Sequence, residues 1–168
     1  MLQHLTYRSI TEFAALTAGD ADALAATARG LQGGMSGAGE RPLRGKNLGL
    51  LCADAAGSGP DTTLLQRAAL ALGAQVALLR PGLTETSTAE QVRHTARILG
   101  RLYDALECVG LSAELVRRIG DGAGVPVFEA LSSPTHPICR LAAPLDPLRP
   151  VSDNRCALMQ AVLLNALT

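Results

Sequence analysis

One stretch, residues 47–81, constrains the fold of this chain more than any other. It contains an apolar run, Leu48–Cys52, a turn of small residues, Ala55–Pro60, then a helical pattern and a second apolar run, Val76–Leu79. This order predicts a strand, a loop, a helix and a second strand. Proteins use a glycine-rich turn that leads into a helix N-terminus to bind anions, because unpaired backbone amides and the helix dipole converge there. The stretch therefore predicts a unit with the form of an anion site.

Residues with the chemistry of caps stand at both ends of the expected helix. Asp61 and Thr62 are suited to N-cap it, and Gly73 stands where a left-handed residue would end it. A capping Asp61 would itself fill the position of a bound anion. We therefore favour a plain strand-to-helix connection, and the glycine-flanked Ser58 leaves a small-anion site as the alternative.

Composition bounds the class of protein. With 168 residues, 48% of them hydrophobic, the chain is long enough for one full-sized domain with a core and too short for two ordinary ones. The formal net charge is +0 and aromatic residues are only 2%, so we predict no nucleic-acid partner. No apolar run approaches the ~20 residues that a membrane span requires, so no membrane partner is predicted either.

Cysteine usage indicates the compartment. The chain has four cysteines without a CxxC pair: Cys52, Cys108, Cys139 and Cys156. The first residues also lack a basic segment followed by an apolar core, which is the form of a secretion signal. These two observations predict a reduced, cytoplasmic protein.

Two groups of polar residues raise the question of catalysis or metal binding. Four acidic residues lie near the expected strand ends: Asp54, Asp104, Glu107 and Glu129. Their spacing is not diagnostic, so we interpret them as solvated loop carboxylates and predict neither metal nor cofactor. His136 and Cys139 lie three residues apart, but no third group is present to orient them, so a buried cysteine and a loop histidine are favoured over a nucleophilic pair. No catalytic residue is predicted.

The rest of the chain alternates expected helices and strands. A capping box at Ser9–Glu12 begins a short first helix, and Asp20 is expected to cap a second one. Four further elements are expected in this order: a helix over 88–103, a strand over 104–109, a helix from Ser112 and a strand over 125–128. The alternation predicts an α/β fold, a three-layer sandwich in which a parallel four-stranded sheet has helices on both faces.

The end of the chain has a different pattern. Past His136, a short helical piece meets Pro144, Pro147 and Pro150, whose spacing predicts an extended connector. A final helix is expected from about Asp153, and it is apolar enough to dock on the rest of the protein. Ligands of parallel sheets bind at the carboxyl ends of the strands, so the loops there hold the candidate chemistry.

Four separated stretches carry motifs in a fixed order. In chain order, Leu43–Lys46 reads L-R-G-K, residues 94–104 read H-T-A-R-I-L-G-R-L-Y-D, Thr135–Pro137 reads T-H-P, and residues 152–163 begin S-D-N-R-C. In the same order, these stretches resemble the L-x-G-K lead-in, the D-T-A-R-V-L-S-R-x-x-D helix, the H-P-x-Q motif and the E-N-R helix of the aspartate and ornithine carbamoyltransferases. The first three stretches lie in that family's N-terminal carbamoyl-phosphate-binding domain, and the last resembles its C-terminal helix.

The resemblance implies a domain organisation. Between the positions of His136 and Ser152 the family carries a second domain that binds the amino-acid substrate, and this chain has a short proline-rich segment there. The resemblance therefore implies a carbamoyltransferase-like domain over 1–143, a connector over 144–152 in place of the second domain, and a C-terminal helix over 153–168 that packs back on the first domain.

The family's phosphate loop is altered in this chain. That loop reads S-T-R-T-R, and residues 58–62 here read S-G-P-D-T, so only the serine is kept. Pro60 has no amide hydrogen to donate, and Asp61 would place a carboxylate beside a phosphate.

Other ligand positions of the family are altered too. The arginine after the third strand is replaced by Val109 and the glutamine of H-P-x-Q by Cys139, whereas His136 is kept. A charge-assisted hydrogen bond contributes about 1.5–3 kcal/mol, so the loss of three arginines removes roughly 4–9 kcal/mol of binding free energy. The resemblance thus implies a vestigial carbamoyl-phosphate site made of Ser58, Gly59, Pro60, Asp61, Thr62, Val109, His136 and Cys139.

These observations predict a degenerate carbamoyltransferase-like protein that catalyses no carbamoyl transfer of its own. The resemblance implies an oligomer, either a homotrimer or a structural or regulatory subunit bound to a carbamoyltransferase or a neighbouring enzyme. One alternative is a changed site for a small carbamoyl-like or carboxylate ligand. Another is a partnered carbamoyltransferase of amino-acid metabolism that binds carbamoyl phosphate weakly and draws positive charge from Arg80, Arg101 or Arg140.

Overall fold

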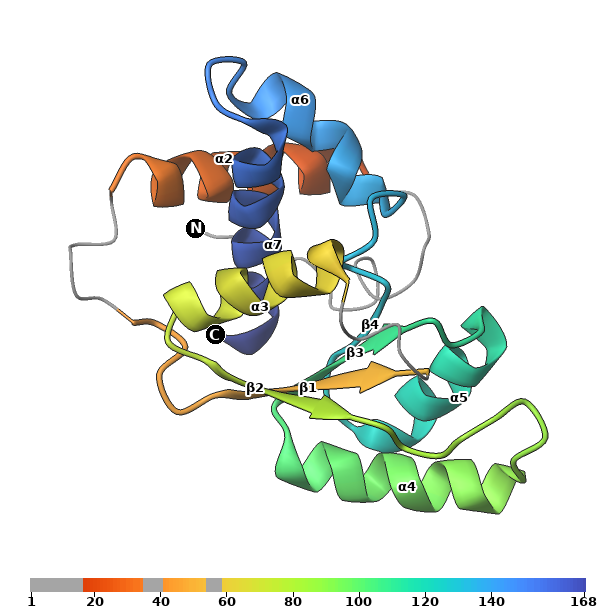
Figure 1. The fold of residues 1–168 in the computed structure, drawn as a ribbon. Coiled ribbons are helices and arrows are strands. Elements are labelled where there is room, and N and C mark those ends of the chain that lie inside the picture. Colours follow the sequence, from red (N-terminus) through yellow and green to blue (C-terminus); the bar gives the residue numbers. More distant parts are fainter. Residues whose placement is uncertain (1–16, 35–40, 54–58) are drawn as a thin grey trace.

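A four-stranded, all-parallel sheet forms the middle layer of the protein (Figure 1). The computed structural model describes residues 17–34, 41–53 and 59–168. The strands are β1 (Asn47–Cys52), β2 (Gln75–Leu79), β3 (Ala105–Val109) and β4 (Val127–Glu129), in the order β2-β1-β3-β4. The central strands β1 and β3 are almost wholly buried, which is why they appear in the sequence as continuous apolar runs.

Helices cover both faces of this sheet, so the predicted three-layer α/β fold is confirmed (Figure 1). One face carries α2 (Ala18–Gln32), α3 (Pro60–Ala71), η2 (Pro137–Leu141), α6 (Ala142–Leu145) and α7 (Val151–Leu167). The other face carries α4 (Ala89–Leu102) and α5 (Ala113–Ala123). Each layer has its own apolar cluster, because alternate side chains of a strand point to opposite faces.

Several helix ends follow the predicted caps and two do not. Thr88 and Ser112 cap α4 and α5, and Gly73 adopts a left-handed φ of 92° after α3, as expected. The N-cap of α2 is Thr17 and not Asp20, because Asp20 stands three residues later and completes a capping box with it. The box predicted at residues 9–12 lies outside the described part of the chain.

The start of α3 also differs from the prediction. Gly59 is the N-cap, with no side-chain cap, and Pro60 is the first helical residue. Asp61 therefore lies inside the first turn and does not cap the helix. Proline is favourable at this position because its missing amide hydrogen would have no helical partner.

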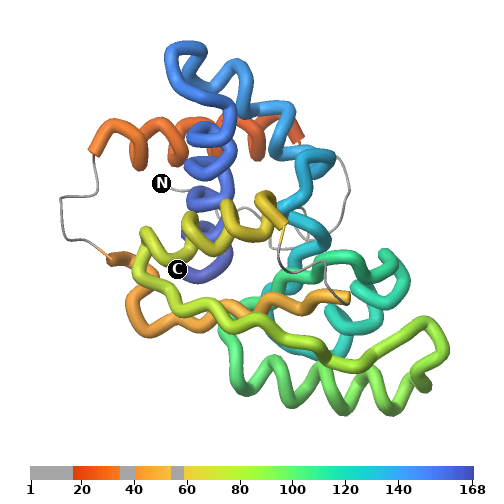
Figure 2. Tube along the Cα trace, viewed as in Figure 1, coloured from red at the N-terminus to blue at the C-terminus, as the bar shows by residue number. Residues whose placement is uncertain are grey.

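The predicted extended connector is shorter than expected. Pro144 lies within the single turn of α6, where a proline is tolerated, and α7 begins directly after Pro150. Only residues 146–150 separate the two helices. α7 packs against α2 and α3, although these segments are far apart in the sequence (Figure 2). The division of the chain at residues 143 and 152 remains a prediction.

None of the helices in the described part of the chain is both long and apolar enough to cross a membrane.

Candidate functional site

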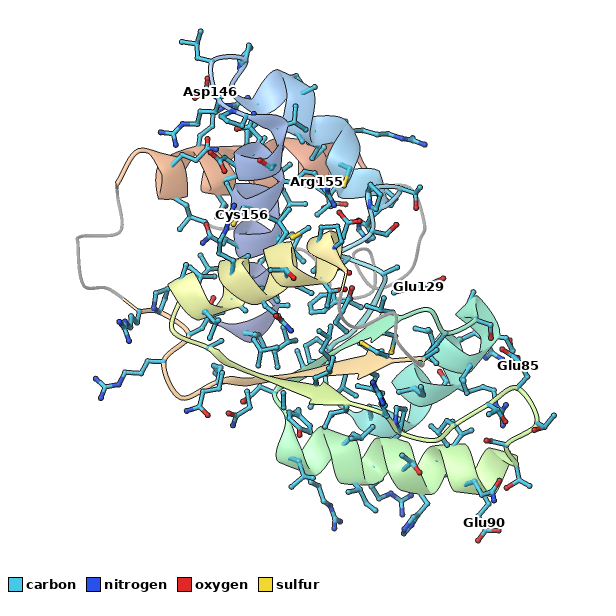
Figure 3. All side chains as sticks on the ribbon, in the orientation of Figure 1. Glu85, Glu90, Glu129, Asp146, Arg155 and Cys156 are labelled. Atoms are coloured by element: carbon cyan, nitrogen blue, oxygen red, sulfur yellow. The ribbon has the colours of Figure 1, made fainter. Side chains whose placement is uncertain are left out.

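The candidate site lies at the carboxyl edge of the sheet, on the face that carries α3 and α7. Three segments meet there: the first turn of α3, the loop after β4 and the first half of α7 (Figures 1 and 3). Arg155 of α7 is the residue that contacts both of the other two segments.

Asp61 is paired with this arginine. The Arg155 Nη2 atom lies 2.9 Å from Asp61 Oδ1, and the side chains are 15% and 39% exposed respectively. The pair brings a carboxylate to the N-terminal turn of α3, where the helix dipole favours negative charge. The position at which a phosphate would meet this helix therefore holds a side chain of the protein.

Arg155 also contacts the loop after β4. The same Nη2 atom donates a hydrogen bond of 2.9 Å to the Ser132 carbonyl oxygen. Its Nε atom is buried and has no acceptor among the described residues. The sequence analysis did not name Arg155 as a site residue, although its place in the D-N-R motif was a usable signal.

His136 is buried beside this site, with its side chain at the start of η2. Its Nδ1 atom accepts a hydrogen bond of 3.3 Å from the Ile138 amide, which fixes Nδ1 as an unprotonated nitrogen. Burial lowers the pKa of His136 to about 4, so the imidazole is neutral at pH 7. It therefore provides no positive charge for an anion or a thiolate.

Cys139 is half-buried on η2 and carries an ordinary thiol. Its Sγ atom donates a hydrogen bond of 3.4 Å to the Ser133 carbonyl oxygen. Desolvation raises the pKa of Cys139, and the nearby Arg155 offsets only part of that increase. A raised thiol pKa beside a neutral histidine does not favour a nucleophilic pair.

The other predicted site residues are more scattered. Thr62 is buried in the first turn of α3, and the half-buried Val109 ends β3, where its carbonyl oxygen accepts from the Ala53 amide at 3.0 Å. Val109 offers no charge. Ser58 lies outside the described residues. Arg101, one of the three arginines considered as replacements, belongs to α4 on the opposite face of the sheet.

Glu107 is the polar residue that the sequence analysis misinterpreted. We expected a solvated loop carboxylate, but Glu107 lies within β3 and is 0% exposed. Its Oε1 atom accepts from the Ser132 amide at 3.0 Å and from Ser132 Oγ at 3.1 Å, whereas Oε2 has no partner among the described residues. Burial raises its pKa to about 8, against the lowering effect of these hydrogen bonds, so Glu107 is mainly protonated at pH 7.

Asp104 also has a defined role in the fold. Its carboxylate accepts from the Asn47 amide at 2.8 Å and lies 3.4 Å from Lys46 Nζ, so it ties the start of β1 to the segment before β3. Within the described ranges, no three histidine, cysteine, aspartate or glutamate residues come together in a group that would hold a metal ion.

The fold is an α/β sandwich with polar residues at the carboxyl edge of a parallel sheet, the edge at which sheets of this class bind ligands when they have them. None of the known family models matches the chain. By sequence, the chain is 36% identical to the ornithine carbamoyltransferase of Haemophilus influenzae (strain PittGG) over 107 residues, which are 64% of this chain and 31% of that protein.

Solved structures agree with the sequence match. The ornithine carbamoyltransferase from Pyrococcus furiosus superposes with a TM-score of 0.61 at 26% identity, covering 77% of this chain and 41% of that one. The enzyme from Gloeobacter violaceus superposes with a TM-score of 0.57 at 29% identity, covering 76% and 39%. The chain is thus similar in sequence and in fold to the ornithine carbamoyltransferases, and it spans about a third of the length of the curated relative from Haemophilus.

Proposed function

We propose that this chain is a carbamoyltransferase-like protein that transfers no carbamoyl group itself and acts as an oligomeric structural or regulatory subunit. The observation that carries the proposal is the Asp61–Arg155 ion pair at the first turn of α3. A phosphate binding there would have to displace the Asp61 carboxylate from its guanidinium, or be placed beside a like charge.

Two further features of the same turn support the proposal. Pro60, the first residue of α3, cannot donate an amide hydrogen bond, and Gly59 before it contributes no side chain. Arg155 is the arginine that contacts this turn among the described residues, and Asp61 already neutralises it. Among the described residues of this turn, no further arginine is available to replace the roughly 4–9 kcal/mol estimated for three arginine contacts.

The proposed assembly is a homotrimer, or a hetero-oligomer with a carbamoyltransferase or a neighbouring enzyme, in the cytoplasm. Its support is the family likeness together with two exposed aliphatic side chains on the outer face of α4. Ile98 and Leu102 of that helix are 45% and 61% exposed, and aliphatic side chains on one helix face are typical of a surface that a partner covers.

Thermal unfolding with millimolar carbamoyl phosphate tests the loss of the anion site, with inorganic phosphate as the control anion. A ligand at 100 times its dissociation constant adds about 2.7 kcal/mol of stability. We expect no shift of the melting temperature with either compound. A shift specific to carbamoyl phosphate would contradict the proposal and favour the partnered carbamoyltransferase.

Light scattering on the purified protein and copurification from its own host test the proposed assembly. We expect either a homo-oligomer or a stable complex with a carbamoyltransferase or another enzyme. A chain that stays monomeric and copurifies with no other subunit would remove this part of the proposal while leaving the loss of activity untouched.

A second candidate function is a binding site for a different small ligand, such as a carboxylate or a carbamoyl-like compound. The observation in its favour is that two buried polar atoms near Ser132, Glu107 Oε2 and Arg155 Nε, have no partner among the described residues. Replacing His136 by Asn or Cys139 by Ala discriminates the two functions. An altered activity or ligand response with unchanged assembly would favour the binding site.

A further inference from the structure

A continuous chain of polar contacts connects the core of the sheet with the start of α3. Ser132 donates its amide and hydroxyl hydrogens to Glu107 of β3, at 3.0 and 3.1 Å. The Ser132 carbonyl oxygen accepts from Arg155 of α7 at 2.9 Å, and the same guanidinium nitrogen lies 2.9 Å from Asp61 of α3. Ser132 therefore links the buried carboxyl to the ion pair.

The contacts on either side of Ser132 are incomplete. Glu107 Oε2 and Arg155 Nε are the two buried side-chain atoms without a hydrogen-bond partner in the described part of the chain. A buried polar atom without a partner is unfavourable. Once Oε2 has lost its proton, a rearrangement that brought it to the Arg155 Nε–H group would satisfy both atoms, and it would draw the guanidinium away from Asp61.

The loop that holds Ser132 has a strained backbone. Ala130 has a φ of 52°, the one positive value found at a non-glycine residue in the described ranges. A residue with a β-carbon adopts this conformation only where its surroundings enforce it. Its amide donates to the Cys108 carbonyl oxygen at 3.0 Å, and the two hydrogen bonds from Ser132 to Glu107 hold the loop two residues further on.

No cation on the strands balances a charge at Glu107. The titratable groups that interact with Glu107 are the thiols of Cys52 on β1 and Cys108 on β3, and Glu129 at the end of β4 acts on Cys108. On the helix side, α7 contributes Arg155, which is already bound to Asp61 of α3, and Arg80 after β2 acts on Cys52. His136 is neutral at pH 7. Of these cations, Arg155 is the one that shares a hydrogen-bond partner, Ser132, with Glu107.

We propose that Glu107 is a proton-sensitive anchor for the Asp61–Arg155 ion pair, which is held while Glu107 is protonated and weakened when Glu107 ionises. On ionisation, the proton on the carboxyl passes to base in the solvent, and the carboxylate attracts the Arg155 guanidinium. The inference rests on the proposed function, because it assigns a regulation to the same occluded site. Burial places the transition near pH 8, the pKa of Glu107.

Carbon-13 NMR of the side-chain carboxyls in the full chain, from pH 6 to pH 10, tests the proposal. We expect the chemical shift of the Glu107 carboxyl carbon to titrate with a midpoint near pH 8. The chemical shift of the Asp61 carboxyl carbon should show a step with the same midpoint. A step at Asp61 that shares its midpoint with Glu107 reports a change in the surroundings of Asp61.

The matched variant is Glu107→Gln, which keeps an oxygen acceptor for Ser132 but cannot ionise. The step at Asp61 should disappear in this variant. Asp153 is an internal control, because it lies two residues before Arg155 but pairs with Arg67, and its signal should show no step in either protein. The α-amino group, which titrates at about 7.7–8.0, is unchanged by the substitution, so it cannot explain a loss of the step.

Three results would overturn the proposal: a Glu107 signal already ionised at pH 7, a titrating Glu107 without a step at Asp61, or a step that persists in the glutamine variant. The first two are measured on the unmodified protein, so the test does not depend on the folding of the variant. The experiment uses no ligand. Binding of carbamoyl phosphate by the unmodified protein would contradict the proposed function without deciding this result.

Discussion

At the residue scale, the site is defined by which charges are paired and which are buried. Asp61 and Arg155 neutralise each other at the start of α3, His136 is kept neutral by burial, and Glu107 is kept protonated by burial. Each of these states depends on neighbours that are distant in the sequence. The residues themselves are ordinary in type.

Replacing Asp61 by Ala should lower the free energy of unfolding by about 1–2 kcal/mol, because it leaves the mostly buried Arg155 guanidinium without its carboxylate. Urea denaturation measures this change. The matched control is Asp153→Ala, which removes the same charge from an ion pair with Arg67 in which the side chains are 49% and 60% exposed. The control should change stability by no more than about 0.5 kcal/mol, and an equal loss in both variants would argue against a special role for Asp61.

Stability should fall with rising pH because of Glu107. Its pKa is about 8 in the folded protein against 4.5 ordinarily, so the folded state binds more protons than the unfolded state between these values. The contribution of Glu107 to the free energy of unfolding is complete below pH 4.5 and is lost as the pH rises through 8. Unfolding midpoints in urea, measured across this range, should decline less in Glu107→Gln than in the unmodified protein. Parallel pH profiles would refute the assignment.

His136 should act in the opposite direction. Its pKa is about 4 in the folded protein against 6.5 ordinarily, so its contribution to stability is complete above pH 6.5 and is lost as the pH falls through 4. In His136→Asn, the decline of the unfolding midpoint between pH 6.5 and pH 4 should be smaller. A decline as steep as in the unmodified protein would assign the acid sensitivity to other groups.

At the element scale, the sheet layers were predictable and the helix ends less so. Continuous apolar runs such as Leu48–Cys52 identified the buried parallel strands directly, because burial on both faces requires them. The start of α3 was misjudged because Asp61 has the chemistry of an N-cap, yet its carboxylate pairs with Arg155 of α7. No local pattern reveals that partner.

The contact between α4 and α5 depends on a glycine. A β-carbon at Gly100 would overlap the Ala123 carbonyl oxygen, so Gly100→Ala should force the helices apart and cost about 1–3 kcal/mol. Gly120 of α5 is the matched control, because a β-carbon there would meet the nearest atom, Val127 Cβ, at an ordinary 4.0 Å. Gly120→Ala should be neutral or stabilising by up to about 1 kcal/mol, since alanine has the higher helix propensity. Denaturant unfolding of both variants measures the difference, and equal effects would contradict the close contact.

At the scale of the whole molecule, α7 completes the core on one face of the sheet. Leu158 of this helix is 0% exposed and belongs to the cluster formed with α2 and α3. Leu158→Ala should therefore cost about 2–5 kcal/mol, the range for a buried leucine that leaves a cavity. Leu148→Ala is the control, because that side chain is 96% exposed and should change stability by no more than about 0.5 kcal/mol. Equal melting temperatures of the two variants would mean that α7 does not stabilise the fold.

The sequence by itself determined the layers of this protein and its likeness to the carbamoyltransferases, because strand burial, helix period and motif spacing are local properties of the chain. The tertiary structure alone decided the chemistry of the site. Glu107 lies five residues after the end of α4, within the strand expected over 104–109, and was interpreted as a solvated acid near a strand end. β3 in fact carries its side chain into the core, where desolvation keeps it protonated. Arg155 reaches Asp61 only because α7 packs back on α3. Burial and pairing between distant segments are properties of the folded chain, so no local pattern could predict them.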